Sequence, residues 1–201
     1  MNLLAHIYLS GSNDQIRIGN FIGDYVKGRK YRLYPPMMMK GILLHRSIDT
    51  YTDHNILPGK VKSIFRPAYR KYAGIVVDLF YDHFLANGWE TYSAKDLSEY
   101  IEDFYGILES RFDQLPPAVQ SFVPGMIRHN RLYSYKYLEG IEKALYLMSQ
   151  HTSLPDQTSQ AMKLLSENYH LINNNFHQFF PRIISNVESL YDVAVEYHKA
   201  L

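Results

Sequence analysis

Apolar residues recur three and four positions apart along most of the chain, which is the spacing of a helix that buries one face. Alternating runs typical of strands are scarce, as are the Asn-Gly and Asp-Gly pairs that signal hairpins. There is no internal repeat, low-complexity tract or linker. The sequence therefore predicts an all-α protein, a helical bundle that forms one domain over residues 1–201.

Capping residues, prolines and glycines mark the boundaries of the predicted helices. After a short first helix, Ser12-Asn13-Asp14 offers an N-cap to a segment that runs to about Lys27 and ends at Gly28. The sequence Leu57-Pro58-Gly59 predicts a turn. A helix is expected over residues 37–53, and the helical stretch after the turn reaches Leu85, with a break or kink near Pro67. The remaining helices are expected over 93–112, with a capping box that begins at Ser93, from 117, and over 135–150, 158–180 and 181–198.

The composition is that of an ordinary globular protein, with 46% hydrophobic and 20% charged residues. The absence of cysteine excludes disulfides, thiolate metal sites and a cysteine nucleophile. No apolar run approaches the roughly 18–20 residues of a membrane span, and the N-terminus lacks the basic flank of a signal peptide. We therefore expect a soluble, cytoplasmic protein.

Charge is divided unevenly along the chain. Residues 1–89 hold twelve Lys and Arg against six Asp, a net charge of +6, and residues 90–201 have a net charge of −5. This division suggests that the first half meets an anionic partner. The alternative is a chance segregation of surface charges that mix again in the folded protein.

His45, Asp49 and Asp53 recur every four residues and so share one face of the predicted helix over residues 37–53. An imidazole and carboxylates stacked in this way suit a divalent metal or a proton relay. A single His-x-x-x-Asp pair also occurs in capped or salt-bridged helices, so the motif does not decide between these interpretations.

Asp78 and Asp82 stand one turn apart in a strongly apolar segment, and His83 follows directly. Buried carboxylates need a cation, a metal or strong hydrogen bonds. An internal salt bridge to an arginine such as Arg46 is the alternative to a metal or catalytic role.

Asn20 and Asp24 lie four residues apart in another apolar segment, and His6 lies alone in the first helix. Gly19 and Gly23, in the same segment, would weaken a helix by roughly 1 kcal/mol each unless another backbone or a ligand approaches closely there.

Oxygen and imidazole ligands without thiolates favour Mn²⁺, Mg²⁺ or Fe²⁺ over zinc. The chain has no P-loop, dinucleotide-binding loop, Gly-x-Ser-x-Gly elbow or His-Glu-x-x-His motif. The reaction class that remains for a His/Asp metal site in a helical bundle is phosphoester hydrolysis.

The ordered segments resemble the acyl carrier protein phosphodiesterases, also called acyl carrier protein hydrolases, which are divergent relatives of the HD-domain metal phosphohydrolases. The resemblance is carried by residues 2–6, 19–28, 41–53 and 78–84, with weaker similarity near 137–141 and 179–182. It implies an HD-domain-like fold and the hydrolysis of the phosphodiester that joins 4′-phosphopantetheine to a carrier-protein serine, with Mn²⁺ or Mg²⁺. No His-Asp dipeptide is present in that order.

On this resemblance Asp24 and His6 match the HD aspartate and the early histidine, Asp82 matches the later acid, and His45 or His83 supplies the missing imidazole. We therefore expect three sets of residues: catalytic residues, metal ligands, and basic residues that bind the acidic carrier protein. The expected catalytic residues are Asp24, Asn20 and Arg46; the expected metal ligands are His6, Asp24, His45, Asp49, Asp82 and His83; the expected partner-binding residues are Lys27, Arg29, Lys30, Arg66 and Arg70.

Two other functions remain open. One is an HD-type phosphohydrolase that acts on a nucleotide, and the other is a non-catalytic helical module that binds an acidic partner. The modest charge and the placement of the aromatic residues match no nucleic-acid-binding module. The sequence leaves the oligomeric state open.

Overall fold

The computed structural model describes residues 1–195, and every regular element in that part of the chain is a helix, which confirms the all-α prediction. Short 3-10 helices cover Gly23–Tyr25, Lys30–Leu33, Arg70–Tyr72, Trp89–Thr91 and Phe112–Gln114. The α-helices are α1 Leu3–Tyr8, α2 Asp14–Phe21, α3 Pro36–His54, α4 Ile56–Tyr69, α5 Ala73–Asn87, α6 Leu97–Ser110, α7 Pro117–Arg128, α8 Arg131–Ser134, α9 Leu138–His151, α10 Thr158–Glu167 and α11 Tyr169–Tyr191.

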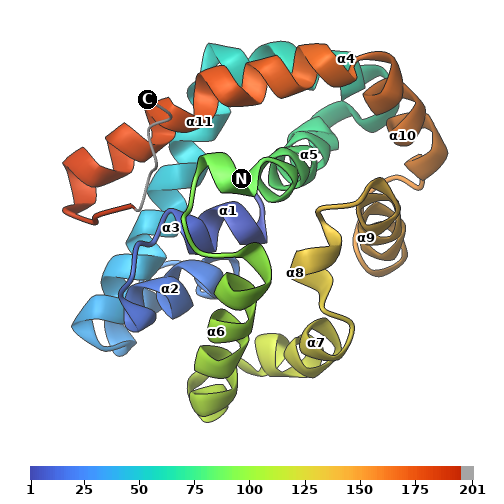
Figure 1. The fold of residues 1–201 in the computed structure, drawn as a ribbon. Helices are drawn as coiled ribbons and strands as arrows, with labels where there is room; N and C mark the ends of the chain where they lie inside the picture. Colours follow the sequence, from blue (N-terminus) through green and yellow to red (C-terminus); the bar gives the residue numbers. More distant parts are fainter. Residues whose placement is uncertain (196–201) are drawn as a thin grey trace.

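The short helix α1 lies near the middle of the molecule, with α2, α3 and α5 around it (Figure 1). Helix α11 runs across α3, α4 and α5 and closes the fold on one side. Its aromatic residues Phe176, Phe179 and Phe180 are fully buried. Phe176 and Phe180 also pack against Tyr92, which ties the C-terminal helix to the segment before α6. The central position of α1 places the N-terminal residues beside the polar side chains of α3.

Helices α2 and α3 approach each other closely through two glycines. A Cβ atom on Gly19 would lie 2.1 Å from the carbonyl oxygen of Met38, and one on Gly41 would lie 2.3 Å from the carbonyl oxygen of Ile16. The close approach of another backbone, which the sequence predicts near Gly19, is therefore made by α3. This contact brings Asn20 on α2 within reach of both α1 and α3.

Two predicted features of the first half are wrong. Helix α2 ends at Phe21 and not at Lys27, because the chain turns through a 3-10 helix to pass the His45 side chain. The segment predicted as a turn belongs to α4, because Asn55 accepts a hydrogen bond from the backbone N–H of Leu57 and caps the helix. Pro58 then lies in the first turn, where its missing N–H costs nothing.

Boundaries in the second half also differ from expectation. Asp96, not Ser93, caps α6 through the backbone N–H of Ser98. The helix predicted over residues 158–180 divides at Asn168 into α10 and α11, and α11 continues through Pro181 to Tyr191. The predicted end at residue 198 lies outside the described residues.

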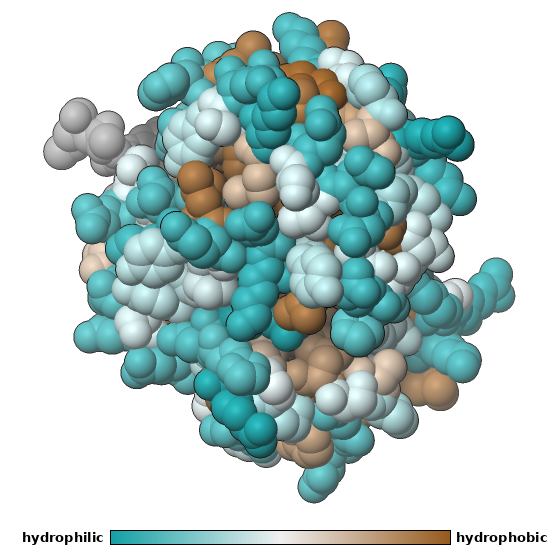
Figure 2. Space-filling model, turned by 90° about the vertical axis from the view of Figure 1, so that its right-hand side faces the viewer, coloured by the Kyte–Doolittle hydropathy of each residue, from teal (hydrophilic) through white to brown (hydrophobic). Residues whose placement is uncertain are grey.

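Within the described residues, no helix is long and apolar enough to cross a membrane. Figure 2 shows the side on which α8, α9 and α10 lie, and hydrophilic side chains cover most of it. Hydrophobic atoms appear there as separate patches rather than as one continuous face.

Candidate metal centre

His6, His45 and Asp49 form a cluster in which one ligand atom from each residue lies within 4.8 Å of the others. His6 comes from α1, and His45 and Asp49 come from successive turns of α3. Nε2 of His6 is 3.1 Å from Oδ1 of Asp49, and Nε2 of His45 is 3.2 Å from Oδ2 of the same carboxylate. Both histidines are buried, whereas the Asp49 side chain is 40% exposed, so the cluster opens toward solvent at the carboxylate.

Asn20 fixes the orientation of both imidazole rings. Its Nδ2 donates to the carbonyl oxygen of His6 and to Oγ of Ser10, which leaves Oδ1 as the acceptor 2.7 Å from Nδ1 of His6. The backbone oxygen of Asn20 is 2.8 Å from Nδ1 of His45. Each Nδ1 therefore carries a proton and donates it, and each Nε2 faces the shared carboxylate. An acceptor that takes the Nδ1 proton in this way fixes the tautomer of a histidine that binds metal through Nε2.

The cluster holds more acceptors than donors. Nε2 of His6 faces both the Asp49 carboxylate and the carbonyl oxygen of Met1, at 3.1 Å each. Nε2 of His45 is buried between two carboxylates, 3.2 Å from Oδ2 of Asp49 and 3.4 Å from Oδ1 of Asp24. Lone pairs that converge in this way need a cation between them. The donor set of two imidazoles and one or two carboxylates therefore fits a divalent metal.

The charges in the cluster are strongly coupled. Burial lowers the pKa of His6, and the neighbouring His45 lowers it further. Burial alone would lower the pKa of His45 as well, but the carboxylates of Asp24 and Asp49 outweigh it and raise that pKa to about 9. Burial opposes ionisation of Asp49, yet the two histidines hold its pKa well below the ordinary range. The site thus stabilises an ionised carboxylate and a cation beside it, which is a proton on His45 in the metal-free protein and can be replaced by a metal ion.

Gly23 makes room for the His45 ring. A Cβ atom on Gly23 would lie 2.2 Å from Cγ of His45, so any larger residue would collide with the imidazole. The close approach that the sequence predicts at Gly23 is therefore made by the His45 side chain. It also places Asp24 beside His45, where the hydrogen-bonding imidazole lowers the pKa of the Asp24 carboxyl.

A cavity of about 390 Å³ opens beside Asp49 of the cluster, between the two residues that precede α1 and helices α3, α5 and α9. Several of its charged groups are already paired. Asp53 accepts a hydrogen bond from Lys62 at 2.6 Å, and Asp78 lies 3.1 Å from the amino group of Met1. The exposed Lys71 also lines the cavity. Its walls are formed by Met1, Asn2, Asp24, Asp49, Asp53, Lys71, Gly74, Ile75, Asp78 and Met148.

The structure does not bring Asp82 into the cluster. Asp82 is fully buried, and its two oxygens accept hydrogen bonds from the backbone N–H groups of Leu4 and Ala5, at 2.7 and 3.0 Å. Burial raises its pKa to about 7 against the opposing effect of these two donors. The carboxylate holds the first turn of α1, so it positions His6 instead of facing the cavity.

His83 lies apart from the cluster. Its Nδ1 is 2.9 Å from the carbonyl oxygen of Tyr135, and its Nε2 is 3.0 Å from the hydroxyl of Tyr169. Burial lowers the pKa of His83. Both nitrogens are used in joining α5 to the second half of the chain, and His83 does not line the cavity.

Arg46 also points away from the cavity. Its guanidinium donates to the carbonyl oxygens of Val26 and Gly28, at 2.6 and 2.9 Å, and lies over the ring of Tyr31. It pairs with none of the buried carboxylates and instead holds the segment that follows Asp24. The basic residues expected to bind a partner, Lys27, Arg29, Lys30, Arg66 and Arg70, are all exposed.

Sequence reasoning missed the contribution of Met1 to the cavity and the partner of Asp78. The backbone oxygen and amino group of Met1 carry no side-chain signal, so only the fold shows that they lie at the cluster. Asp78 stood out as a carboxylate in an apolar helix, but its partner could not be named from sequence.

Comparisons with known proteins identify the family of this chain. A family model described as acyl carrier protein phosphodiesterase matches residues 1–183. The acyl carrier protein phosphodiesterase of Enterobacter sp. (strain 638) is 29% identical over 92% of this chain and 96% of its own length. Those of Photorhabdus laumondii and Klebsiella pneumoniae are 28% and 29% identical, each over 94% of this chain and over 96% and 98% of their own lengths. No solved structure matches significantly. Because the family model spans nearly the whole chain, the protein belongs to the acyl carrier protein phosphodiesterase family of hydrolases.

Proposed function

We propose that this protein is a metal-dependent phosphodiesterase that hydrolyses 4′-phosphopantetheine from holo-acyl carrier protein and leaves the apo-protein. The observation that supports this proposal most is the convergence of His6, His45 and Asp49 beside an open cavity, with both histidines held in the tautomer that presents Nε2. The description of the family and the names of the relatives, acyl carrier protein phosphodiesterase, also support it.

His6, His45 and Asp49 would hold the metal, and Asp24 at the rim is a further ligand or a base. Mn²⁺ is the expected ion, with Mg²⁺ or Fe²⁺ as alternatives, because the donors are nitrogen and oxygen without sulfur. When bound, a divalent cation lowers the pKa of water and neutralises charge on the phosphodiester oxygens. The four carboxylates of the cavity would otherwise repel a phosphodiester.

The remaining residues bind, orient or move protons. Asp24 has a largely exposed side chain next to His45, so its carboxylate can accept a proton from the attacking water. Lys71 lies on the cavity wall, where its ammonium group can contact a phosphate oxygen. Arg46 acts indirectly, since its bonds to Val26 and Gly28 hold the backbone that carries Asp24.

The exposed basic residues are sequence neighbours of two residues that line this cavity, Asp24 and Lys71. Lys27, Arg29 and Lys30 follow Asp24, and Arg66 and Arg70 precede Lys71. An acidic carrier protein that docks on both sides would deliver its prosthetic group to the cavity between them.

The test is to incubate the purified protein with holo-acyl carrier protein, with Mn²⁺ or with a chelator, and to follow the carrier protein by mass spectrometry. The proposal expects a metal-dependent mass loss equal to phosphopantetheine. Hydrolysis of free nucleotides in its place would indicate a nucleotide phosphohydrolase. Binding of the carrier protein without turnover or metal uptake would indicate a non-catalytic module.

A further inference from the structure

Arg17 is a buried arginine whose charge is not neutralised. It lies on α2 with only 6% of its surface exposed, and its guanidinium stacks over the rings of Tyr100 at 4.7 Å and Phe104 at 5.2 Å. Its Nε and Nη2 atoms are buried and have no hydrogen-bond partner among the described residues. No carboxylate of the described residues lies within ion-pair distance of it.

A buried guanidinium in this state is unusual, because its N–H groups lose their water without gaining acceptors. Stacking on aromatic rings compensates for part of the lost hydration but satisfies none of the N–H donors. The geometry of a guanidinium matches a planar carboxylate or a phosphate, which accept two parallel hydrogen bonds from it. Arg17 therefore has the properties of an anchor for an oxyanion.

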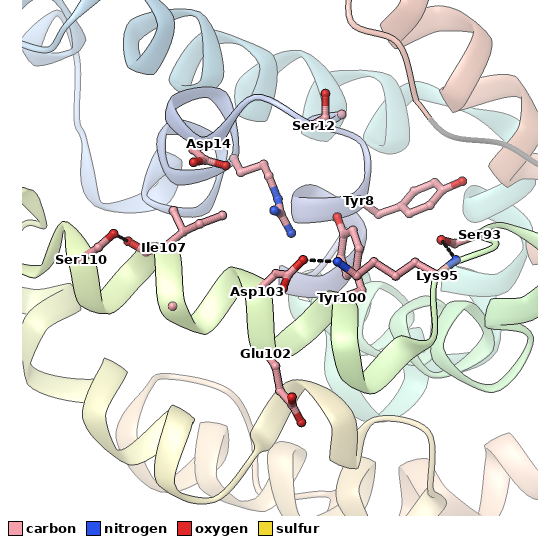
Figure 3. A pocket seen from close by; sticks show the side chains of 13 residues that line it. Tyr8, Ser12, Asp14, Ser93, Lys95, Tyr100, Glu102, Asp103, Ile107 and Ser110 are labelled. Atoms are coloured by element: carbon pink, nitrogen blue, oxygen red, sulfur yellow. Dashed lines mark hydrogen bonds and ion pairs between the residues drawn. The ribbon is translucent and has the colours of Figure 1, made fainter.

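Arg17 lines a cavity of about 660 Å³ that α1, α2 and α6 form together with the loop before α6. This cavity shares no lining residue with the one in front of the histidine cluster. Figure 3 shows that its labelled side chains come from opposite walls, with Ser12 on one side and Lys95, Tyr100 and Asp103 on the other.

The acidic residues of this cavity do not neutralise Arg17. Lys95 pairs with Asp103, as the dashed line in Figure 3 shows. Glu102 points away from the other labelled side chains and accepts a hydrogen bond from Ser98. Asp14 is exposed at the start of α2.

We propose that this cavity is a second binding site, for a small organic molecule that carries a carboxylate or phosphate group. The oxyanion would lie on the Arg17 guanidinium, with the hydroxyls of Ser12 and Ser93 as further donors nearby. The volume exceeds what an inorganic anion fills, and Tyr8, Tyr100 and Ile107 supply apolar wall for an organic body. The proposal is independent of the phosphodiesterase function.

The only tryptophan of the chain reports on this site. The Trp89 ring is 4.7 Å from the ring of Tyr100 and 5.5 Å from that of Tyr8, and its Nε1 donates to the carbonyl oxygen of Lys95. Occupation of the cavity should therefore change the fluorescence of Trp89. Phenyl phosphate and benzoate share a ring and differ in the oxyanion, so they identify which anion is preferred, and inorganic phosphate tests the head group alone.

The experiment is a fluorescence titration of the full-length protein with these three probes. We expect a saturable change with phenyl phosphate or benzoate, with a dissociation constant below about 1 mM, and weaker binding of inorganic phosphate. Arg17→Met keeps the length and stacking of the side chain and should weaken binding by at least about tenfold. Arg17→Lys keeps the charge but loses the paired donors, so it should bind more weakly than the wild type.

Arg128→Met is the matched control, because it removes an exposed arginine that lines a different cavity. Its dissociation constants should equal those of the wild type. Circular dichroism shows whether each variant is folded. If no probe gives a saturable change, or if folded Arg17→Lys binds as tightly as the wild type, the second site is disproved.

Discussion

The imidazole rings of His6 and His45 stack with their centroids 4.1 Å apart and their planes 19° from parallel. Both rings present Nε2 to the single carboxylate of Asp49. Two imidazolium ions could not share this position without strong repulsion, so at most one of the two rings is protonated at a time. The stacked pair is therefore arranged to share one cation, and a divalent metal bound by both Nε2 atoms meets this requirement.

Asp49→Asn should weaken Mn²⁺ binding by more than about 100-fold, because the substitution removes a charged ligand, and even the loss of a group that only hydrogen-bonds to a ligand weakens binding by roughly 10–100-fold. Isothermal titration calorimetry on the metal-free protein measures this directly. Asp53→Asn is the control, since Asp53 lines the same cavity one turn further along α3 but pairs with Lys62. Equal loss in both variants would show that general charge, and not the cluster, attracts the metal.

Gly23→Ala should disrupt the site without replacing a proposed ligand. The added methyl group would lie 2.2 Å from Cγ of His45, so the imidazole must move away from Asp49. We expect metal affinity to fall at least about tenfold, as for other changes that disturb ligand orientation. Gly59→Ala is the control, because a Cβ atom there meets nothing within 4 Å and alanine is the better helix former. Unchanged metal binding in Gly23→Ala would refute the role of this close approach.

The stability of the metal-free protein should fall as pH rises from about 6.5 to 9. Asp24 and Asp49 raise the pKa of His45 to about 9 in the folded state, against an ordinary value of 6.5. The proton therefore stabilises the fold fully below pH 6.5, and this contribution, at most about 3 kcal/mol, is lost through pH 9.

Urea unfolding of the wild type and of His45→Gln is compared in the presence of a chelator. The comparison separates the contribution of the His45 proton to the free energy of unfolding from that of other titrating groups. A difference between the two proteins that stays constant or grows with pH over this range would contradict the assigned charge state.

Asp82→Asn should destabilise the protein by about 1–3 kcal/mol, because asparagine offers only one acceptor to the backbone N–H groups of Leu4 and Ala5. Thermal or urea unfolding near pH 7 measures the loss. In Asp96→Asn the exposed cap of α6 changes to an equally good capping residue, so its stability should stay close to that of the wild type. A stable Asp82→Asn variant that has lost only metal would instead place Asp82 among the ligands.

The sequence predicted the helical class and several members of the cluster from local patterns. His45 and Asp49 lie four residues apart on one helix, so their shared face follows from helix geometry alone. The unusual glycines near Asn20 indicated a close approach, and the structure places α3 at Gly19 and His45 at Gly23. The requirement for strong hydrogen bonds at Asp82 is met by backbone donors.

The partners of these residues could not be predicted, because they come from distant segments. His83 follows Asp82 directly, yet its ring faces Tyr135 and Tyr169 and not the cavity. The proximity of Arg46 to His45 in sequence gave no indication that its guanidinium bonds to a loop. Helix spacing gives the relative direction of two side chains on one helix but not the tertiary neighbour that each one meets.

The most direct test compares His45→Ala with His83→Ala in the conversion of holo- to apo-acyl carrier protein with Mn²⁺, followed by mass spectrometry. Both substitutions remove a buried histidine from the first half of the chain, but only His45 belongs to the cluster. The account predicts that folded His45→Ala loses turnover and metal binding, whereas folded His83→Ala retains both. Full turnover by His45→Ala, or loss of metal-dependent turnover in His83→Ala alone, would contradict it.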